Sequence, residues 1–329
     1  MTTEDITRST PNDGWRLFRG DGTTRRVEFP EAPPWRRFNP PAEVFAPPRP
    51  YLIGSAEADV VNAAILLRRP LLVSGYPGTG KSSLAHAVAH ELDLGRVLHW
   101  PINSRSTLQE ALYRYDAVGR LREANLHRDR HDSRDPSATE PGIGSYVRLG
   151  PLGTALVPRA RPRVLLVDEL DKGDVDLPND LLNVFEEGEF EVPELARLTD
   201  HESVVKVLTD DPDERIPVVR GRIRCAEFPV VIITSNGERE FPPAFLRRCI
   251  RLDLPEPDEQ TLRGIVEAHL GAGTLQDVDD LLREFLGRRA PGELATDQLL
   301  NAVFLRKGGV DLDAGGLLNA VLHRLGRTV

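Results

Sequence analysis

A glycine-rich loop carries the strongest chemical signal in the sequence. The segment GYPGTGKS at positions 75–82 fits the pattern G-x-x-x-x-G-K-[ST], and it lies between a short apolar stretch, 71–74, and a helical stretch, 83–92. Glycines let such a loop curl until its backbone N–H groups face phosphate oxygens, and the N-terminus of the next helix favours the same negative charge. The sequence therefore predicts a phosphate-binding loop, with contacts from Gly75, Tyr76, Pro77, Gly78, Thr79, Gly80, Lys81, Ser82 and Ser83.

Two side chains of the loop and two later carboxylates have more specific expected roles. Lys81 would reach the β- and γ-phosphates of a nucleotide, and Ser82 would ligate Mg²⁺. Asp168 and Glu169 directly follow the apolar run VLLV at 164–167, so they would lie at the carboxyl edge of a parallel sheet, where such folds bind ligands. There, Asp168 would complete the Mg²⁺ site and Glu169 would be the catalytic base that orients the attacking water.

Further polar groups follow the next apolar run. Asn236 comes at the end of VVIITSN, 230–236, where its amide could hydrogen-bond the γ-phosphate or the attacking water. Arg247 and Arg248 lie shortly after it, just before another β-prone segment. A pair of arginines in this place suits an arginine finger, which neutralises charge that develops on a transferred phosphoryl group.

These residues need a scaffold of alternating strands and helices. We predict strands at 71–74, 97–100, 164–167, 230–234 and 249–254, because these runs are apolar without strict alternation, as in parallel strands buried on both faces. The fold class is therefore α/β, a three-layer P-loop NTPase core with a parallel five-stranded sheet. One helix is expected at 55–69, and helices near 258–270, 275–286, 296–306 and 314–325 would form a small all-helical lid domain. Thr274 with Asp277 resembles a capping box.

The chain divides into three predicted parts: an arm at 1–50, the core at 51–255 and the lid at 256–329. Eight prolines between Pro30 and Pro50 predict an extended arm, either a strap on the surface or a docking arm for a neighbouring subunit or partner. Residues 120–147 and 187–222 are too long for ordinary connections, so we expect functional loops or mobile insertions there.

Composition excludes several classes of protein. The net charge of −9 over 329 residues argues against general binding to nucleic acid or to an anionic membrane. Two cysteines, Cys225 and Cys249, build neither a disulfide scaffold nor a zinc site. No apolar run reaches the roughly 18 residues that span a bilayer. We expect a soluble, cytoplasmic protein.

The ordered set GYPGTGKS, VLLVDELDK, ITSN and PPAFLRR resembles an AAA+ ATPase over roughly residues 51–329. Softer patterns are similar to the MoxR branch: DELDK at 168–172, LLNVFEEG at 181–188 and GPLG at 150–153. The resemblance implies ATP and Mg²⁺ as cofactors, with Asn236 as sensor 1 and Arg248, or else Arg247, as the finger. It also implies a homo-oligomeric ring, usually hexameric, that remodels a client protein or a partner with a von Willebrand factor A (VWA) domain, in a bacterial conflict or defence setting. One departure is the absence of a sensor 2 arginine near 294–298, for which Arg288 or Arg289 could substitute.

Two other functions stay open at this stage. The chain could be a nucleotide-gated assembly switch with little turnover, which the weak sensor 2 favours and the full catalytic set disfavours. It could also be an NTPase directed to nucleic acid, which the acidic charge and the lack of a recognisable DNA-binding motif disfavour.

Overall fold

A computed structural model describes residues 15–37, 51–131, 142–199, 203–271, 273–274, 278–288, 294–313 and 316–323, with backbone only for 127–131. The chain forms two compact units. One consists of residues 53–75 and 80–254, and the other of residues 1–52, 76–79 and 255–329. Among the described residues, no helix is both long enough and apolar enough to cross a membrane.

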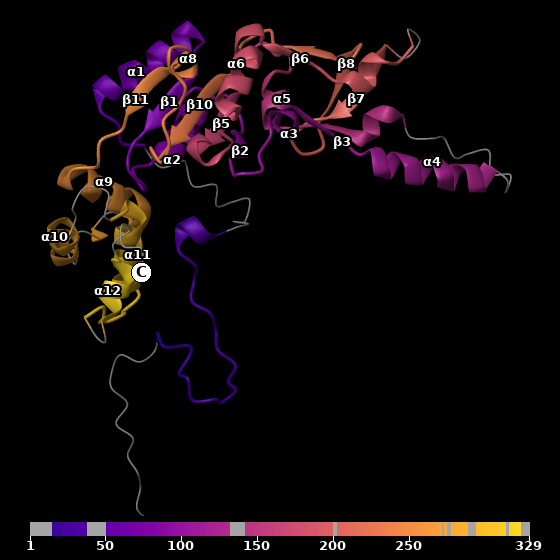
Figure 1. The fold of residues 1–329 in the computed structure, drawn as a ribbon. Coiled ribbons are helices and arrows are strands. Elements are labelled where there is room, and N and C mark those ends of the chain that lie inside the picture. Colours follow the sequence, from indigo (N-terminus) through magenta and orange to yellow (C-terminus); the bar gives the residue numbers. More distant parts are fainter. Residues whose placement is uncertain are drawn as a thin grey trace, which may run out of the picture. The chain divides into compact units, whose positions relative to one another are not determined.

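A parallel five-stranded sheet forms the centre of the first unit (Figure 1). Its strands are β1 (Leu71–Ser74), β2 (Leu98–Pro101), β5 (Val164–Asp168), β10 (Val230–Ser235) and β11 (Ile250–Asp253), in the order β11-β1-β10-β5-β2. The predicted α/β fold with a parallel five-stranded sheet is confirmed, and each expected strand lies within a residue or two of an observed one. Helix α1 (Ser55–Leu67) packs on β11 and α2 (Lys81–Glu91) on β5. The inner strands β1, β5 and β10 are apolar and buried along most of their length, whereas the edge strands β2 and β11 also carry exposed residues.

A second, six-stranded sheet was not predicted. It contains β3 (Tyr113–Tyr115), β4 (Val147–Leu149), β6 (Glu189–Glu191), β7 (Val204–Leu208), β8 (Arg215–Val219) and β9 (Arg222–Arg224), in the order β3-β4-β7-β8-β9-β6. Residues 187–222, for which we expected a functional loop or a mobile insertion, thus contain strands of this sheet. In the other long connection, α4 (Ala117–His131) is a helix, and residues 132–141 lie outside the described residues. Strands of three to five residues with one exposed face give too weak an apolar pattern to predict.

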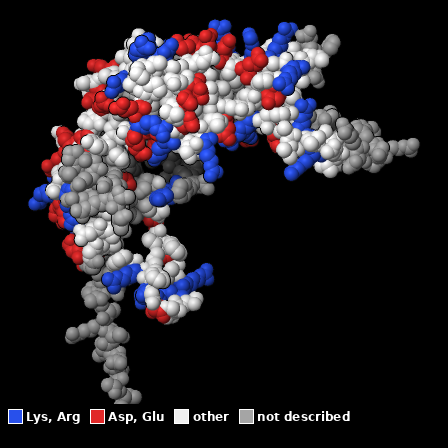
Figure 2. Space-filling view, viewed as in Figure 1, with Lys and Arg blue, Asp and Glu red and all other residues white. Residues whose placement is uncertain are grey.

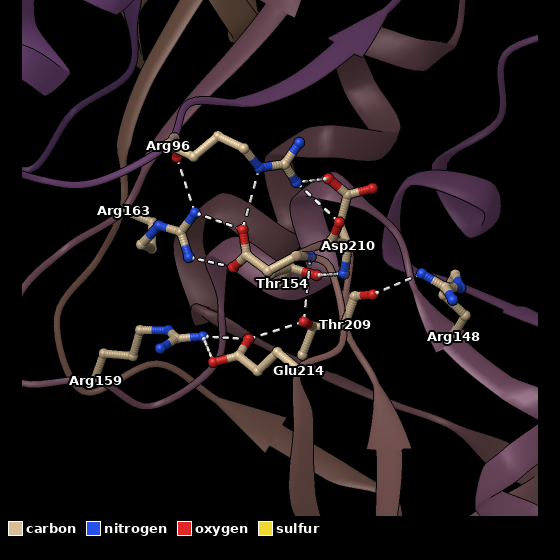
Figure 3. A network of polar contacts seen from close by, with 9 residues as sticks. Arg96, Arg148, Thr154, Arg159, Arg163, Thr209, Asp210 and Glu214 are labelled. Carbon is tan, nitrogen blue, oxygen red and sulfur yellow. Dashed lines mark hydrogen bonds and ion pairs between the residues drawn. The ribbon is translucent and has the colours of Figure 1, made fainter. Parts of the chain in front are cut away.

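Polar side chains join the turn between β7 and β8 to the five-stranded sheet (Figure 3). Arg163, which precedes β5, donates to Asp211 with an Nη1–Oδ2 distance of 2.5 Å, and Arg96 pairs with both Asp210 and Asp211. The buried hydroxyl of Thr154 accepts a hydrogen bond from the Asp210 backbone at 2.9 Å. The hairpin is thus tied to the amino ends of β2 and β5, the edge of the sheet opposite Asp168.

Short helices connect and flank the strands of the two sheets. Helices α3 (Leu108–Leu112) and α5 (Pro151–Ala155) pack together, while α6 (Leu177–Glu187) contacts α8 (Pro243–Leu246), and α7 (Pro193–Ala196) follows β6. The short helices η3 (Ile143–Tyr146) and η4 (Leu170–Lys172) precede β4 and follow β5. A Cβ atom at Gly153 would lie 1.9 Å from the carbonyl oxygen of Leu112, so α5 can approach α3 this closely only with glycine there.

The lid helices are α9 (Glu259–Leu270), α10 (Asp279–Arg288), α11 (Thr296–Lys307) and α12 (Leu317–Val321), around a core that includes Phe285. Helix α10 begins at Asp279, later than predicted, and the capping box at Thr274 is wrong. The Thr274 hydroxyl instead donates to the carbonyls of Leu270 and Gly271 at the end of α9, and Asp277 lies outside the described residues.

The described part of the N-terminal arm packs on the lid. Trp15 and Trp35, the latter in the short helix η1 (Pro34–Arg36), lie against the lid core. The Trp35 indole N–H donates to Asn301 Oδ1 at 3.2 Å, and its ring meets Phe304 edge-on with centroids 5.9 Å apart. Residues 38–50, which hold five of the eight prolines, lie outside the described residues.

Candidate functional site

The phosphate-binding loop follows β1 and runs directly into α2. Gly75, Gly78 and Gly80 all have positive φ, 148°, 78° and 86°, which residues with a Cβ rarely adopt. Gly80 is the N-cap of α2, so the helix begins with Lys81 and Ser82, as the motif requires. Tyr76 is exposed at the loop, and Ser83 is exposed on the first turn of α2.

Lys81 is a buried cation that turns back over the loop. Its side chain is 7% exposed, and its ammonium donates to the Gly75 carbonyl at 2.8 Å. Burial lowers the pKa of Lys81, while the nearby carboxylates of Asp171, Glu169 and Asp168 oppose that shift. The charge of Lys81 therefore interacts with the carboxylates at and after the end of β5.

Asp168, at the end of β5, is the centre of a hydrogen-bond cluster. Its Oδ1 accepts from the hydroxyls of Ser82 at 2.6 Å and Thr234 at 2.7 Å, and His99 Nε2 lies 3.2 Å from Oδ2. Burial alone would raise the pKa of Asp168, but hydrogen bonds from His99, Ser82 and Thr234 outweigh it and hold the pKa at about 2. Asp168 is therefore an ionised carboxylate at neutral pH.

Glu169 and Asn236 meet beside this cluster. The Asn236 amide donates to Glu169 Oε1 at 3.1 Å, and Lys172 Nζ donates to Oε2 at 2.8 Å. Glu169 has φ 60° and ψ 50°, a left-handed conformation that is strained for a residue other than glycine. Its backbone N–H donates to Thr234 Oγ1 at 2.8 Å, which helps to hold this conformation.

The paired arginines have other partners. Arg248 Nε donates to Glu186 Oε1 at 2.6 Å, near the end of α6, and its Nη1 donates to the Ala244 carbonyl. Arg247 is exposed, and its carbonyl accepts from Arg69. In the lid, Arg288 bonds Asn319 and Glu284, while Arg289 lies outside the described residues. The predicted site thus divides into a connected group, from Lys81 to Asn236, and arginines that no hydrogen bond joins to it in the described part of the chain.

Four members of the connected group were not assigned a role from sequence: His99, Thr234, Asp171 and Lys172. His99 is on β2, two residues before the register partner of Asp168, so only the strand order brings it near. Thr234 is in β10, which pairs with β5. The sequence predicts that these strands are parallel, but it does not predict which of their residues lie side by side.

The oxygen donors fit a divalent cation of the magnesium type. A hydroxyl and an ionised carboxylate, 2.6 Å apart in Ser82 and Asp168, come from two different elements at one edge of the sheet. Mg²⁺ prefers oxygen ligands, and it is usually held by one or two protein groups, with waters and substrate phosphates completing the set. Ser82 and Asp168 are the residues that would hold it.

The family comparison assigns this arrangement. Residues 70–249, which extend from the residue before β1 to the residue after the paired arginines, match the AAA domain of the dynein-related subfamily. The chain belongs to the AAA domain family. Membership implies a nucleotide-hydrolysing ATPase, and it accounts for the glycine loop, the Asp168–Glu169 pair and Asn236 lying on neighbouring strands. The arm and the lid lie outside the matched residues.

Solved structures resemble this AAA chain only distantly. A Cytophaga hutchinsonii protein with a provisional ATPase assignment is 13% identical at a TM-score of 0.36, covering 76% of this chain and 56% of that one. NtrX from Brucella abortus, solved with ATP, is 14% identical at 0.42, covering 83% and 54%. The FIGL-1 AAA domain, solved with ADP, is 15% identical at 0.38, covering 82% and 75%. The chain therefore spans about half the length of the first two. No curated protein matches it.

Proposed function

We propose that this AAA protein is a Mg²⁺-dependent ATP phosphohydrolase of the MoxR-like type, which acts as a hexameric ring to remodel a client or VWA-domain partner protein. The observation that carries the ATPase part is the hydrogen-bonded chain through Ser82, Asp168, Thr234, Glu169 and Asn236 at one edge of the sheet. The MoxR-like branch, the ring, the partner, the cytoplasmic location and the conflict or defence setting rest on the sequence resemblance.

Each side chain has a definable task in this proposal. The loop N–H groups and the Lys81 ammonium bind the phosphates, and Lys81 would exchange the Gly75 carbonyl for a phosphate oxygen. Asn236 and Lys172 orient the Glu169 carboxylate, which accepts the hydrogen bond of the attacking water. Mg²⁺, when bound, neutralises phosphate charge. Arg248 would leave Glu186 and enter the site of a neighbouring subunit, with Arg247 as the alternative finger.

The first test separates binding from hydrolysis at one site. We expect Lys81→Ala to lose nucleotide binding, because the buried cation that neutralises the phosphates is gone. Glu169→Gln should bind ATP with wild-type affinity and lose at least about 100-fold in turnover, within the range for a positioned general base. Fluorescent-nucleotide titration and steady-state phosphate release measure the two properties. If Glu169→Gln turned over ATP at the wild-type rate, the assignment of Glu169 as the catalytic base would be wrong.

A second test addresses the ring. Arg248→Ala should be inactive alone but bind nucleotide normally, because its proposed target lies in another subunit. Mixing Arg248→Ala with Lys81→Ala should restore ATPase activity at intermediate ratios, since some interfaces would combine an intact loop with an intact finger. Size-exclusion chromatography with light scattering on each mixture confirms that the two chains co-assemble. Co-assembly without any restored activity would argue against a finger acting between subunits.

Two hydrogen bonds to Glu169 favour a second candidate, the nucleotide-gated switch. Lys172 donates to one oxygen of Glu169 and Asn236 to the other, so an attacking water would be a third donor to a carboxylate that already has two. A specific ATPase rate near zero at every protein concentration, with tight ATP binding, would favour that switch. Stimulation of the ATPase rate by DNA or RNA would instead favour a nucleic-acid-directed enzyme. The face in Figure 2 does not favour that function, because basic and acidic side chains are interspersed over its described residues.

A further inference from the structure

A third acidic residue, Asp171, lies behind the Asp168–Glu169 pair. It is in the short helix η4 that follows β5, and only 3% of it is exposed. Its Oδ2 accepts hydrogen bonds from the backbone N–H groups of Asn236 and Glu238, each at 3.0 Å. One carboxylate oxygen thus holds two positions of the turn after β10.

The other oxygen of Asp171 has a different environment. Oδ1 is buried and has no hydrogen-bond partner in the described part of the chain. Burial of a carboxylate with an unsatisfied oxygen costs free energy, so such a group needs a compensating contribution. The two backbone donors to Oδ2 supply part of that compensation.

We infer that Asp171 is a positioning residue for the reaction: it fixes the turn after β10 so that the Asn236 amide faces Glu169. This inference rests on the proposed ATPase function. The Asn236 backbone is held by Asp171 while the Asn236 side chain holds Glu169, so a shift of the turn would move the amide away from the catalytic carboxylate.

Two substitutions separate the acceptor from the charge. Asp171→Ala leaves the N–H groups of Asn236 and Glu238 without their acceptor. Asp171→Asn can keep both bonds through its amide oxygen and place its NH₂ group toward the side of Oδ1, losing only the charge. We expect turnover to fall at least about tenfold in Asp171→Ala and to stay within about threefold of wild type in Asp171→Asn, with nucleotide affinity changed by less than about threefold in both. Asp180→Ala, an exposed acid on α6, is the matched control and should change none of these quantities.

A double-mutant cycle distinguishes positioning from a general loss of structure. If Asp171 acts through Asn236, Asp171→Ala should lower turnover by about tenfold in the wild-type background and by less than about twofold in an Asn236→Ala background. Turnover is normalised to the fraction of protein that binds nucleotide, so unfolded molecules do not count. An equal loss in both backgrounds would overturn the inference.

A readout without catalysis keeps the inference separate from the proposed function. Amide hydrogen exchange at residues 236–238, followed by mass spectrometry, should be slow in wild type and Asp171→Asn and markedly faster in Asp171→Ala. If the wild-type chain hydrolyses no ATP, the proposed function fails, while this exchange pattern still decides whether Asp171 holds the turn after β10. If wild type is active and Asp171→Ala matches it in rate and exchange, the inference alone fails.

Discussion

Glu169 combines a reactive carboxylate with a backbone conformation that only glycine adopts freely. Its φ of 60° is imposed by the turn from β5 into η4, and the Thr234 hydroxyl and Asn236 amide hold the residue on both sides. Strain of this kind costs on the order of 1–3 kcal/mol and persists where surrounding contacts fix the backbone. The strain at Glu169 therefore lowers the free energy of unfolding, and the contacts that maintain it fix the direction of the carboxylate.

This strain predicts that glycine is more stable than alanine at position 169, the reverse of their usual order in a helix. Both substitutions remove the carboxylate. Glu169→Gly should be more stable than Glu169→Ala by about 1 kcal/mol, because glycine adopts positive φ without a Cβ clash. Both variants should be inactive. Urea unfolding of the two proteins measures the difference.

The same pair of substitutions at Asp59 is the control. Asp59 is exposed in the interior of α1, so there the glycine variant should be less stable than the alanine variant by about 1 kcal/mol. If alanine were the more stable residue at position 169 as well, the left-handed backbone would not be a source of strain.

At the scale of elements, the six-stranded sheet depends on its attachment to the parallel sheet. The β7–β8 turn brings Asp210, Asp211 and Glu214 to arginines that precede β2 and β5 (Figure 3). Arg163 hydrogen-bonding lowers the pKa of Asp211, burial opposes that shift, and the charge of Arg163 and pairing with Arg96 add to the lowering. The hairpin is therefore held by ionised pairs rather than by apolar contact alone.

Arg163→Ala tests this attachment. The Arg163 side chain is 12% exposed and makes two bonds to Asp211, so its loss should reduce the free energy of unfolding by about 2 kcal/mol. Arg161 is the matched control: its side chain is 60% exposed, its nearest carboxylate oxygen is 3.5 Å away, and it donates to the Leu92 carbonyl at an exposed position. Arg161→Ala should cost less than about 0.5 kcal/mol. Equal losses in the two variants, measured by urea unfolding, would contradict the attachment.

The elements also show how far the sequence is sufficient. The five parallel strands were predictable because β1, β5 and β10 are mostly apolar runs and the edge strands β2 and β11 still have large apolar residues at every second position. The Ser82–Asp168 and Glu169–Asn236 contacts follow from parallel strands ending at one edge. The second sheet was not predictable, because its strands are short and half-exposed. His99 and Asp171 were missed for another reason: a strand order and a bond to a backbone N–H leave no pattern in the spacing of side chains.

At the scale of the whole molecule, the arm and the lid belong to one unit although they lie at opposite ends of the sequence. Trp35 contributes a ring contact, an indole hydrogen bond and apolar packing to the lid core, whereas Phe18 and Phe29 on the same arm are 89% and 83% exposed. The described arm is thus fastened at its tryptophans. Whether its exposed aromatics also meet another subunit stays a prediction.

Trp35→Ala should destabilise the lid unit. Loss of the half-buried ring and of its bond to Asn301 should cost about 2 kcal/mol, because the lid core loses packing that no other described residue of the arm except Trp15 provides. Differential scanning calorimetry is the measurement, and we expect the two units to unfold in separate transitions. Phe29→Ala should leave both transitions unchanged. A lid transition unaffected by Trp35→Ala would show that the arm is not part of the lid's stability.

The separation between Trp35 and Asn301 has a consequence for protein synthesis. The two side chains are 266 positions apart, so at roughly 5–20 residues per second the ribosome needs about 13–53 s to complete the tryptophan's binding surface after Trp35 itself is made. The whole nucleotide-binding core emerges during that interval. The growing chain must therefore carry Trp35 and the aromatic, proline-rich segment around it without the native partner surface until the lid residues near Asn301 have been made, and this is the period in which a chaperone would have most to bind.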